Sequence, residues 1–170
     1  HPDDESSKGA ATMARYVDLN ADLGEEVTDD VALLDIVSSA NVACGYHAGN
    51  AAIMASVCAQ AAERGVSVGA QVSYDDRANF GRVALDVPVA VLRDQVADQV
   101  GLLRSAATAA GTDVRYVKPH GALYHRVLDD EAASMALAEL AIEFMPTDDG
   151  VGVVSFGLHN DEVGHPPGDF

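Results

Sequence analysis

Basic residues are scarce in this chain of 170 residues, and so are long apolar runs and aromatic side chains. Lys and Arg together number 10 against 27 Asp and Glu, which gives a formal net charge of −17. Because a phosphate backbone is bound by a basic face, this balance argues against a nucleic-acid partner. No apolar run approaches the length of a membrane span, and the polar, charged start does not resemble a signal peptide. We therefore expect an acidic cytoplasmic protein with no membrane partner.

Cysteine is also scarce, and its placement excludes two further classes of site. Cys44 and Cys58 are the two cysteines, and neither has a Cys-x-x-Cys partner. The sequence therefore indicates no zinc ribbon and no redox pair. We expect both thiols to be small buried apolar groups.

Hydrophobic residues make up 48% of the chain, and its length is enough for one domain with a real core.

Apolar runs alternate with helical patterns along most of the chain. The predicted strands are 15–19, 40–44, 66–70, 113–118 and 150–156, and the predicted helices are 28–37, 51–64, 88–110 and 129–143. Asn50 and Gly65 are the expected N-cap and C-terminal stop of the second helix. This alternation predicts an α/β fold with a parallel sheet and right-handed crossovers. The polar stretch 71–87 is predicted to be a long loop that covers an active site.

Polar side chains gather at or beyond the ends of the predicted strands, where active sites of such folds collect. They are Asp18, Asn20, Glu25, His47, Tyr74, Lys118, His120 and Tyr124. His47 lies in a tight turn between Gly45 and Gly49. Arg82, in the polar loop, could hold a carboxylate or a phosphate with its guanidinium.

Four segments carry a resemblance to a known family. Residues 38–50 read Ser-Ser-Ala-Asn-Val-Ala-Cys-Gly-Tyr-His-Ala-Gly-Asn, and residues 117–124 read Val-Lys-Pro-His-Gly-Ala-Leu-Tyr. Together with residues 17–25 and 68–82, they resemble, in order, motifs of the LamB/YcsF family, the proteins that form the A subunit of 5-oxoprolinase. The resemblance covers about residues 17–140. It implies a distorted β/α barrel similar to those of the glycoside hydrolases and polysaccharide deacetylases.

A complete barrel of the common type needs about 250 residues. We therefore expect an incomplete barrel over residues 16–145, with an open edge that a partner subunit or a homodimer could cover. The resemblance implies ATP-dependent hydrolysis of the lactam 5-oxoproline to L-glutamate, together with partner subunits B and C. The chain has no Gly-x-x-x-x-Gly-Lys-Ser/Thr motif, so a P-loop would not hold the nucleotide.

The expected roles follow from the chemistry of each side chain. His47 and His120 are suited to move protons, and Lys118 is suited to a phosphate. Asp18 and Glu25 are expected to act as base or to bind a divalent ion. The substrate-binding residues are expected to be Asn20, Glu25, Tyr74, Arg82 and Tyr124.

Two alternatives stay open at this point. One is a metal-dependent deacetylase or amidohydrolase that needs no ATP, in which Asp18, His47 and His120 bind the metal. The other is an inactive truncated fragment or a docking subunit.

The two ends of the chain do not fit the family. Residues 1–5, His-Pro-Asp-Asp-Glu, resemble the zinc loop of LmbE-like deacetylases, and the continuation resembles mycothiol S-conjugate amidase. This resemblance implies zinc ligands at His1 and Asp4 with Asp3 as base. Because no strand precedes His1, we expect no zinc there and interpret 1–15 as a foreign or frayed segment. Residues 146–170 are expected to be a strand and an irregular tail, truncated or redirected relative to the family.

Overall fold

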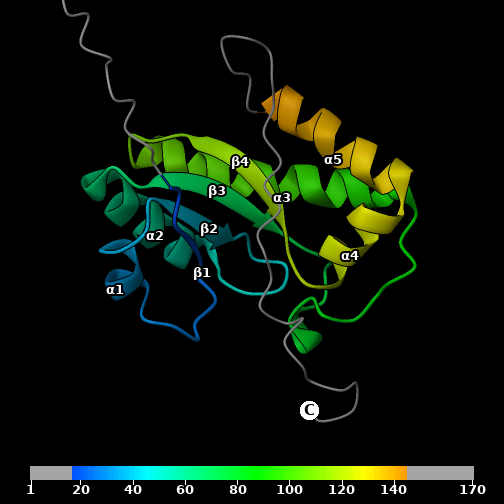
Figure 1. Cartoon of the computed structure of the whole chain (residues 1–170), viewed down its shortest axis with the longest axis horizontal. Coiled ribbons are helices and arrows are strands. Elements are labelled where there is room, and N and C mark those ends of the chain that lie inside the picture. The colour runs from blue at the N-terminus through cyan, green and yellow to red at the C-terminus, as the bar shows by residue number, and fades with distance from the viewer. Residues whose placement is uncertain (1–16, 145–170) are drawn as a thin grey trace, which may run out of the picture.

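Four parallel strands form the centre of the structure, a computed structural model that describes residues 17–144 (Figure 1). The strands are β1 (Asn20–Leu23), β2 (Ser39–Ala43), β3 (Ser67–Val72) and β4 (Val114–Pro119). Their order in the sheet is β1-β2-β3-β4, and every neighbouring pair is parallel. The predicted α/β fold with a parallel sheet is therefore confirmed.

Helices connect successive strands, two more follow β4, and together they cover the sheet. They are α1 (Asp30–Leu34), α2 (Ala51–Arg64), α3 (Val89–Ala109), α4 (Ala122–Asp129) and α5 (Glu131–Phe144), with a 3₁₀ turn at Arg77–Asn79. Helices α2 and α3 pack against each other and against the sheet, and α5 packs on α3 and α4 (Figure 1). Within residues 17–144, no helix is long and apolar enough to cross a membrane.

Helix α2 begins and ends where its sequence predicts. The Asn50 side chain accepts a hydrogen bond from the Ile53 amide at 3.0 Å, and Gly65 ends the helix in the left-handed conformation at φ 67°. These two caps satisfy backbone groups that the helix itself leaves without partners.

Helix α3 turns an apolar stripe toward the sheet, with Leu92, Val96, Val100 and Leu103 fully buried. The same helix carries a buried amide, Gln99. Its Oε1 accepts from the Ser73 amide and its Nε2 donates to the Ser73 carbonyl, both at 2.9 Å. Gln99 therefore fixes the direction in which the chain leaves β3.

The two faces of the sheet differ in polarity. Because side chains alternate along a strand, residues two apart share a face. Leu23, Val42, Val68, Ala70 and Val117 belong to the apolar core. The alternate positions put the polar side chains of Asp22, Asn41, Gln71 and Lys118 on the other face. This polar face leads to the candidate site.

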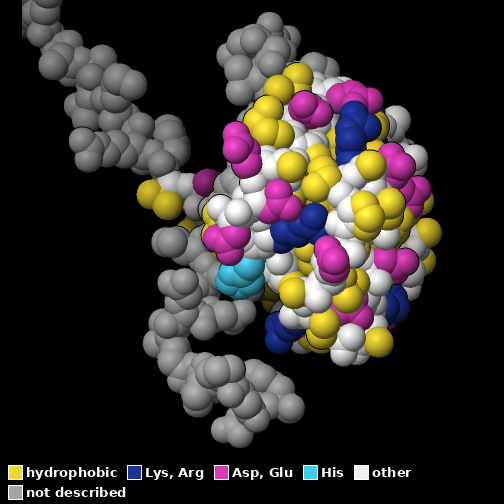
Figure 2. Space-filling model, turned by 90° about the vertical axis from the view of Figure 1, so that its right-hand side faces the viewer, with side chains coloured by type: hydrophobic (Ala, Val, Ile, Leu, Met, Phe, Trp, Pro, Cys, Tyr) yellow, Lys and Arg dark blue, Asp and Glu magenta, His cyan; other side chains and the backbone are white. Residues whose placement is uncertain are grey.

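Acidic side chains on the surface shown in Figure 2 lie among apolar and uncharged ones and do not gather in one patch. This distribution is typical of solvated surface charge.

The first strand lies further along the chain than predicted. It covers Asn20–Leu23 instead of 15–19, and the described part of that earlier stretch, Val17 to Leu19, is exposed. The alternation of apolar and polar residues in 15–19 is therefore not the alternation of a buried strand. The Asp18 carboxylate instead accepts hydrogen bonds from the hydroxyls of Ser38 and Ser39, at 2.5 and 2.7 Å.

Three smaller expectations also need correction. Gln71 and Val72 belong to β3, so the polar loop begins later than predicted. Pro88 is the N-cap of α3 and not its first residue. The stretch after Pro119 contains the helix α4, which buries Leu123 and Val127 four residues apart. The expectations for 1–15, for the strand 150–156 and for the tail lie outside the described residues.

Candidate functional site

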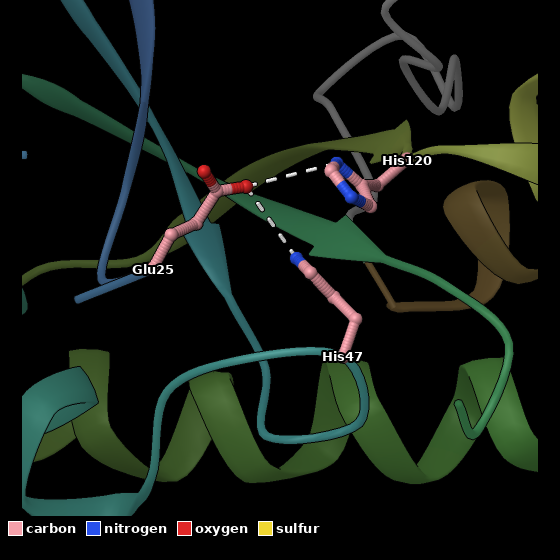
Figure 3. A group of neighbouring side chains, drawn as sticks. All are labelled: Glu25, His47 and His120. Carbon is pink, nitrogen blue, oxygen red and sulfur yellow. Dashed lines mark ion pairs between the residues drawn. The ribbon is translucent and has the colours of Figure 1, made fainter. Parts of the chain in front are cut away.

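Three segments that are distant in the sequence bring Glu25, His47 and His120 together (Figure 3). Glu25 follows β1, His47 lies in the turn after β2, and His120 directly follows β4. Because the strands are parallel, their carboxyl ends meet at one edge of the sheet. Glu25 Oε1 lies 3.5 Å from His47 Nε2 and 3.7 Å from His120 Nδ1. The two imidazole rings stack with their centroids 4.1 Å apart.

Two glycines and the Arg77 side chain define the turn that carries His47. Gly45 and Gly49 have φ angles of 93° and 74°, which glycine adopts without strain. The Arg77 guanidinium donates to the Gly49 carbonyl at 2.6 and 3.0 Å. The sequence therefore predicted the glycine turn correctly, and the 3₁₀ segment that begins at Arg77 braces it.

A second loop closes over the imidazoles at Phe80. The Phe80 ring meets the rings of His47 and His120 edge-on, each at 5.4 Å between centroids. Gly121 makes this approach possible, since a side chain on its α-carbon would collide with the Gly81 carbonyl. The centre is consequently buried, and His47 is 1% exposed.

Gln71, at the end of β3, joins the carboxylate to one imidazole. Its Nε2 donates to Glu25 Oε1 at 2.8 Å and lies 2.9 Å from His120 Nδ1. The side chain is fully buried, and its Oε1 has no hydrogen-bond partner among the described residues. Sequence reasoning missed Gln71 as a site residue, although an amide that directly follows a small apolar strand was a usable signal.

Hydrogen bonding sets the protonation of His120. Its Nε2 lies 3.0 Å from the Phe80 carbonyl, which can only accept, so Nε2 carries the proton and Nδ1 carries a lone pair. Burial, together with the neighbouring His47, lowers the pKa of His120 to about 4 against the opposing charge of Glu25. His120 is therefore neutral at pH 7, and its Nδ1 lone pair accepts a hydrogen bond from the Gln71 amide beside the carboxylate.

The Glu25 carboxylate remains ionised. Burial alone raises its pKa, but the contacts with His47 and Gln71 outweigh burial and leave the pKa below its ordinary value. Of these two contacts, the one with Gln71 has hydrogen-bond geometry, whereas the 3.5 Å approach of His47 is long for a hydrogen bond. The centre thus consists of the ionised carboxylate of Glu25, the neutral imidazole of His120 and the imidazole ring of His47.

An ion pair crosses the polar face beside this centre. Lys118 Nζ on β4 lies 2.5 Å from Asp22 Oδ1 on β1. Asn41 on β2 donates to Asp22 at 2.9 Å and accepts from the Tyr116 hydroxyl at 2.7 Å. Burial raises the pKa of Asp22, but the charge and hydrogen bond of Lys118 and the bond from Asn41 leave it below its ordinary value. Lys118 therefore lies near the carboxyl end of β4, as expected, with its charge paired.

Asp18 does not join the centre, and this expectation was wrong. Its partners Ser38 and Ser39 stand at the amino end of β2, so Asp18 lies at the opposite end of the sheet from His47 and His120. The predicted metal set of Asp18, His47 and His120 is therefore not assembled. Glu25, which was expected to bind substrate and was also a candidate base or ion ligand, supplies the carboxylate instead.

The remaining predicted residues lie apart from the three central side chains. Asn20 accepts a hydrogen bond from Asn41 at 2.9 Å and belongs to the polar face. Arg82 is exposed, with its guanidinium 5.4 Å from the centroid of the Phe80 ring. Tyr74 is buried beside Arg126, and Tyr124 on α4 lies edge-on to His125 at 5.6 Å.

The three central side chains also form a set that could hold a metal ion. Their ligand atoms lie within 4.8 Å of one another. Two imidazoles and one carboxylate are donors that zinc and similar divalent ions take in proteins.

The fold and the site together define a parallel β/α protein with a buried carboxylate–imidazole centre at the carboxyl edge of its sheet. The chain belongs to the LamB/YcsF family, whose profile matches residues 17–161. The family resemblance of the four sequence motifs is thereby confirmed.

Its curated relatives share a name, the A subunit of 5-oxoprolinase. The chain is 61% identical over 128 residues to the protein of that name from Streptomyces avermitilis, a match of 72% of this chain and 51% of that protein. It is 49% identical over 147 residues to the one from Cutibacterium acnes, which covers 84% of this chain and 57% of that protein. The chain thus spans about half the length of these relatives.

A solved structure agrees with the fold. The lactam utilization protein from Thermus thermophilus matches with a TM-score of 0.75 and 35% identity, over 78% of this chain and 56% of that one. The four-stranded parallel sheet with its helices is compatible with a partial β/α barrel.

Proposed function

We propose that the chain contributes the catalytic centre for opening the lactam ring of 5-oxoproline to L-glutamate, as the A subunit of a 5-oxoprolinase. The observation that carries this proposal is the buried Glu25–His47–His120 centre. It is supported by relatives of that name at 49% to 61% identity. Hydrolysis of an amide needs a proton acceptor for water and a proton donor for the leaving amine, and this centre offers both kinds of group.

A lactam carbonyl is a poor electrophile, and we infer that ATP activates it. The lactam oxygen attacks the γ-phosphorus and ADP leaves. Water then adds to the activated carbon, the C–N bond breaks and the nitrogen takes a proton to become a free amine. A second water releases phosphate from the resulting acyl phosphate. One ATP and two waters are therefore consumed for each glutamate, ADP and phosphate formed.

The side chains of the centre divide the proton transfers between them. His120 Nδ1 carries a lone pair, which gives up its hydrogen bond from Gln71 and takes a proton from the attacking water. The ionised Glu25 stabilises the imidazolium that forms, because it lies 3.7 Å away in a buried setting. The imidazolium then returns the proton to the leaving amine. Gln71 holds Glu25 and His120 in place through its amide.

ATP and the partner subunits B and C belong to the same proposal. The chain has no P-loop motif, so the triphosphate must be bound by other means or at a partner's surface. Lys118, one of the cations on the polar face, is engaged with Asp22. Dependence on ATP also favours a cytoplasmic location.

Glutamate release from 5-oxoproline tests the proposal. The full chain is assayed with and without ATP, and with and without subunits B and C. We expect turnover when ATP and partners are both present, and a loss of about 10²- to 10⁴-fold in His120→Ala, the range of general acid–base catalysis. His125→Ala is the control, because His125 is an exposed imidazole five residues away. Folded protein that releases no glutamate under any of these conditions would refute the proposal.

A second candidate function is an ATP-independent amidohydrolase or deacetylase. The observation that favours it is the donor set of Glu25, His47 and His120, which suits a metal that activates water directly. The same assay separates the two functions. Turnover that persists without ATP and is lost with a chelator would favour this second candidate.

A further inference from the structure

We propose that Glu25, His47 and His120 bind one divalent transition-metal ion, with the Gln71 amide beside it. This inference deepens the proposed function, because it assigns an ion to the same centre. With the ion bound, His120 Nδ1 would be a ligand, and the ion would take over the activation of water from that imidazole. Metal binding can be measured without any turnover, so the two proposals can fail separately.

The spacing of the ligand atoms fits such an ion. Bonds of zinc to imidazole nitrogen and carboxylate oxygen place neighbouring ligands of a tetrahedral site about 3.3–3.5 Å apart. Glu25 Oε1 lies 3.5 Å from His47 Nε2 and 3.7 Å from His120 Nδ1. The ligand atoms would need to move by only about a few tenths of an ångström to reach these bond lengths and complete the coordination.

His47 gives an independent reason to expect a ligand. The side chain is 1% exposed, and neither ring nitrogen has a hydrogen-bond partner among the described residues. A buried polar group without a partner is costly and rare in folded proteins. The Nε2 atom of His47 faces Glu25 (Figure 3), so an ion between them would satisfy it.

His120 has the outer contact that metal-binding histidines usually have. Its Nε2 is within hydrogen-bond distance of the Phe80 carbonyl at 3.0 Å. Such a bond to a backbone carbonyl fixes the tautomer and the ring orientation, and it leaves the other nitrogen free to bind a metal. That other nitrogen, Nδ1, is the one that faces Glu25.

The charge balance also favours a cation. Lys118 is the ammonium group of this polar face, and it is paired with Asp22 at 2.5 Å. Among the described residues Glu25 has no ammonium or guanidinium partner, and its hydrogen bond comes from the Gln71 amide. A divalent ion would compensate this buried carboxylate, whereas an apolar or anionic ligand would not.

Gln71 is the fourth side chain at the centre. Its Nε2 lies 2.8 Å from Glu25 and 2.9 Å from His120, and its Oε1 has no hydrogen-bond partner among the described residues. Turning the amide by about 180° exchanges these two atoms without moving the chain and presents the oxygen to the ion. Gln71 is therefore placed either to bind the ion or to hold its carboxylate ligand.

The experiment uses the full chain, freed of metal with a chelator and titrated with Co²⁺ and with Zn²⁺. We expect one ion per chain, with a visible Co²⁺ spectrum typical of low coordination. His47→Ala and Glu25→Gln should each weaken binding by more than about 100-fold, because even loss of a ligand's hydrogen-bond partner costs about 10- to 100-fold. Gln71→His should tighten binding, because it adds an imidazole donor.

Matched controls separate this site from others. His125→Ala removes an exposed imidazole and Glu26→Gln removes the neighbouring exposed carboxylate, so both should bind as the unchanged protein does. His1→Ala tests the zinc-loop resemblance at the start of the chain. Circular dichroism confirms that each variant is folded.

Two results would overturn the inference. One is the absence of stoichiometric binding by the folded chain. The other is binding that survives His47→Ala and Glu25→Gln but is lost in His1→Ala. Turnover of 5-oxoproline by metal-free protein would show that the function holds without the ion. Stoichiometric binding without turnover would support the ion and count against the function.

Discussion

Replacing Lys118 by Met should destabilise the protein, because it leaves Asp22 as an unpaired, largely buried carboxylate. The two side chains are 9% and 23% exposed, and their charged atoms are 2.5 Å apart. Removing one partner of a fully buried pair costs about 3–5 kcal/mol. Asp22 keeps some contact with solvent and a hydrogen bond from Asn41, so we expect about 2–3 kcal/mol, below that range. The midpoint of thermal unfolding should fall by about 4–12 °C.

The assay is urea unfolding followed by circular dichroism. Arg115→Met is the control, because Arg115 lies on the same strand with an exposed ion pair to Asp113 that should contribute about 0–1 kcal/mol. Asp22→Asn combined with Lys118→Met should recover part of the loss, since no buried charge remains. If Lys118→Met unfolds like Arg115→Met, or if the double variant is no better than the single one, the reasoning is wrong.

The same pair has a definite dependence on pH. The pKa of Asp22 is lowered in the folded state, so its contribution is present above the ordinary value of 3.8 and is lost as the pH falls through the lower folded value. In Lys118→Met the unpaired carboxylate can relieve its cost by taking a proton. The stability difference between the two proteins should therefore be largest near neutral pH and should shrink in acid.

Two other predictions concern the backbone and the thiols. Gly121→Ala should lower stability by about 1–3 kcal/mol, because it combines a positive φ with a collision at the Gly81 carbonyl, whereas Gly101→Ala in α3 has open space and should not destabilise. Thermal unfolding of both variants decides this, and equal midpoints would contradict it. Cys44 and Cys58 should resist a thiol reagent in the folded protein and react in urea, because burial raises the pKa of Cys44 and raises that of Cys58 to about 11. Rapid labelling of the native protein would contradict their buried, unreactive state.

Residues that cap or end an element predicted the position of that element correctly. Helix α2 was bounded correctly because Asn50 and Gly65 act through contacts within the helix itself. Strands β2, β3 and β4 are apolar on the buried face and lie within two residues of their predicted bounds. The first strand was misplaced because residues 15–19 alternate between polar and apolar side chains, as those of β1 do. Only pairing with β2 decides which of the two stretches enters the sheet.

The positions of the candidate site residues were predicted in part for the same reason. His47 and His120 were found because each follows a recognisable strand, and the parallel sheet brings their ends together. Glu25 was placed near the site, but its central position depends on the turn after β1, which no local pattern reveals. Gln71 was assigned to a loop because β3 extends two residues further than its apolar run, and Asp18 was included because the first strand was misplaced.

The most direct test of the central claim compares two neighbouring carboxylates. Glu25 lies in the buried centre, and Glu26 is exposed at the surface. The measurement is the rate of glutamate release from 5-oxoproline by Glu25→Gln and by Glu26→Gln, in the full chain with ATP and partner subunits. The account predicts a fall of at least about 100-fold for Glu25→Gln and a rate close to that of the unchanged protein for Glu26→Gln. Equal rates in the two variants would contradict the claim that this centre performs the chemistry.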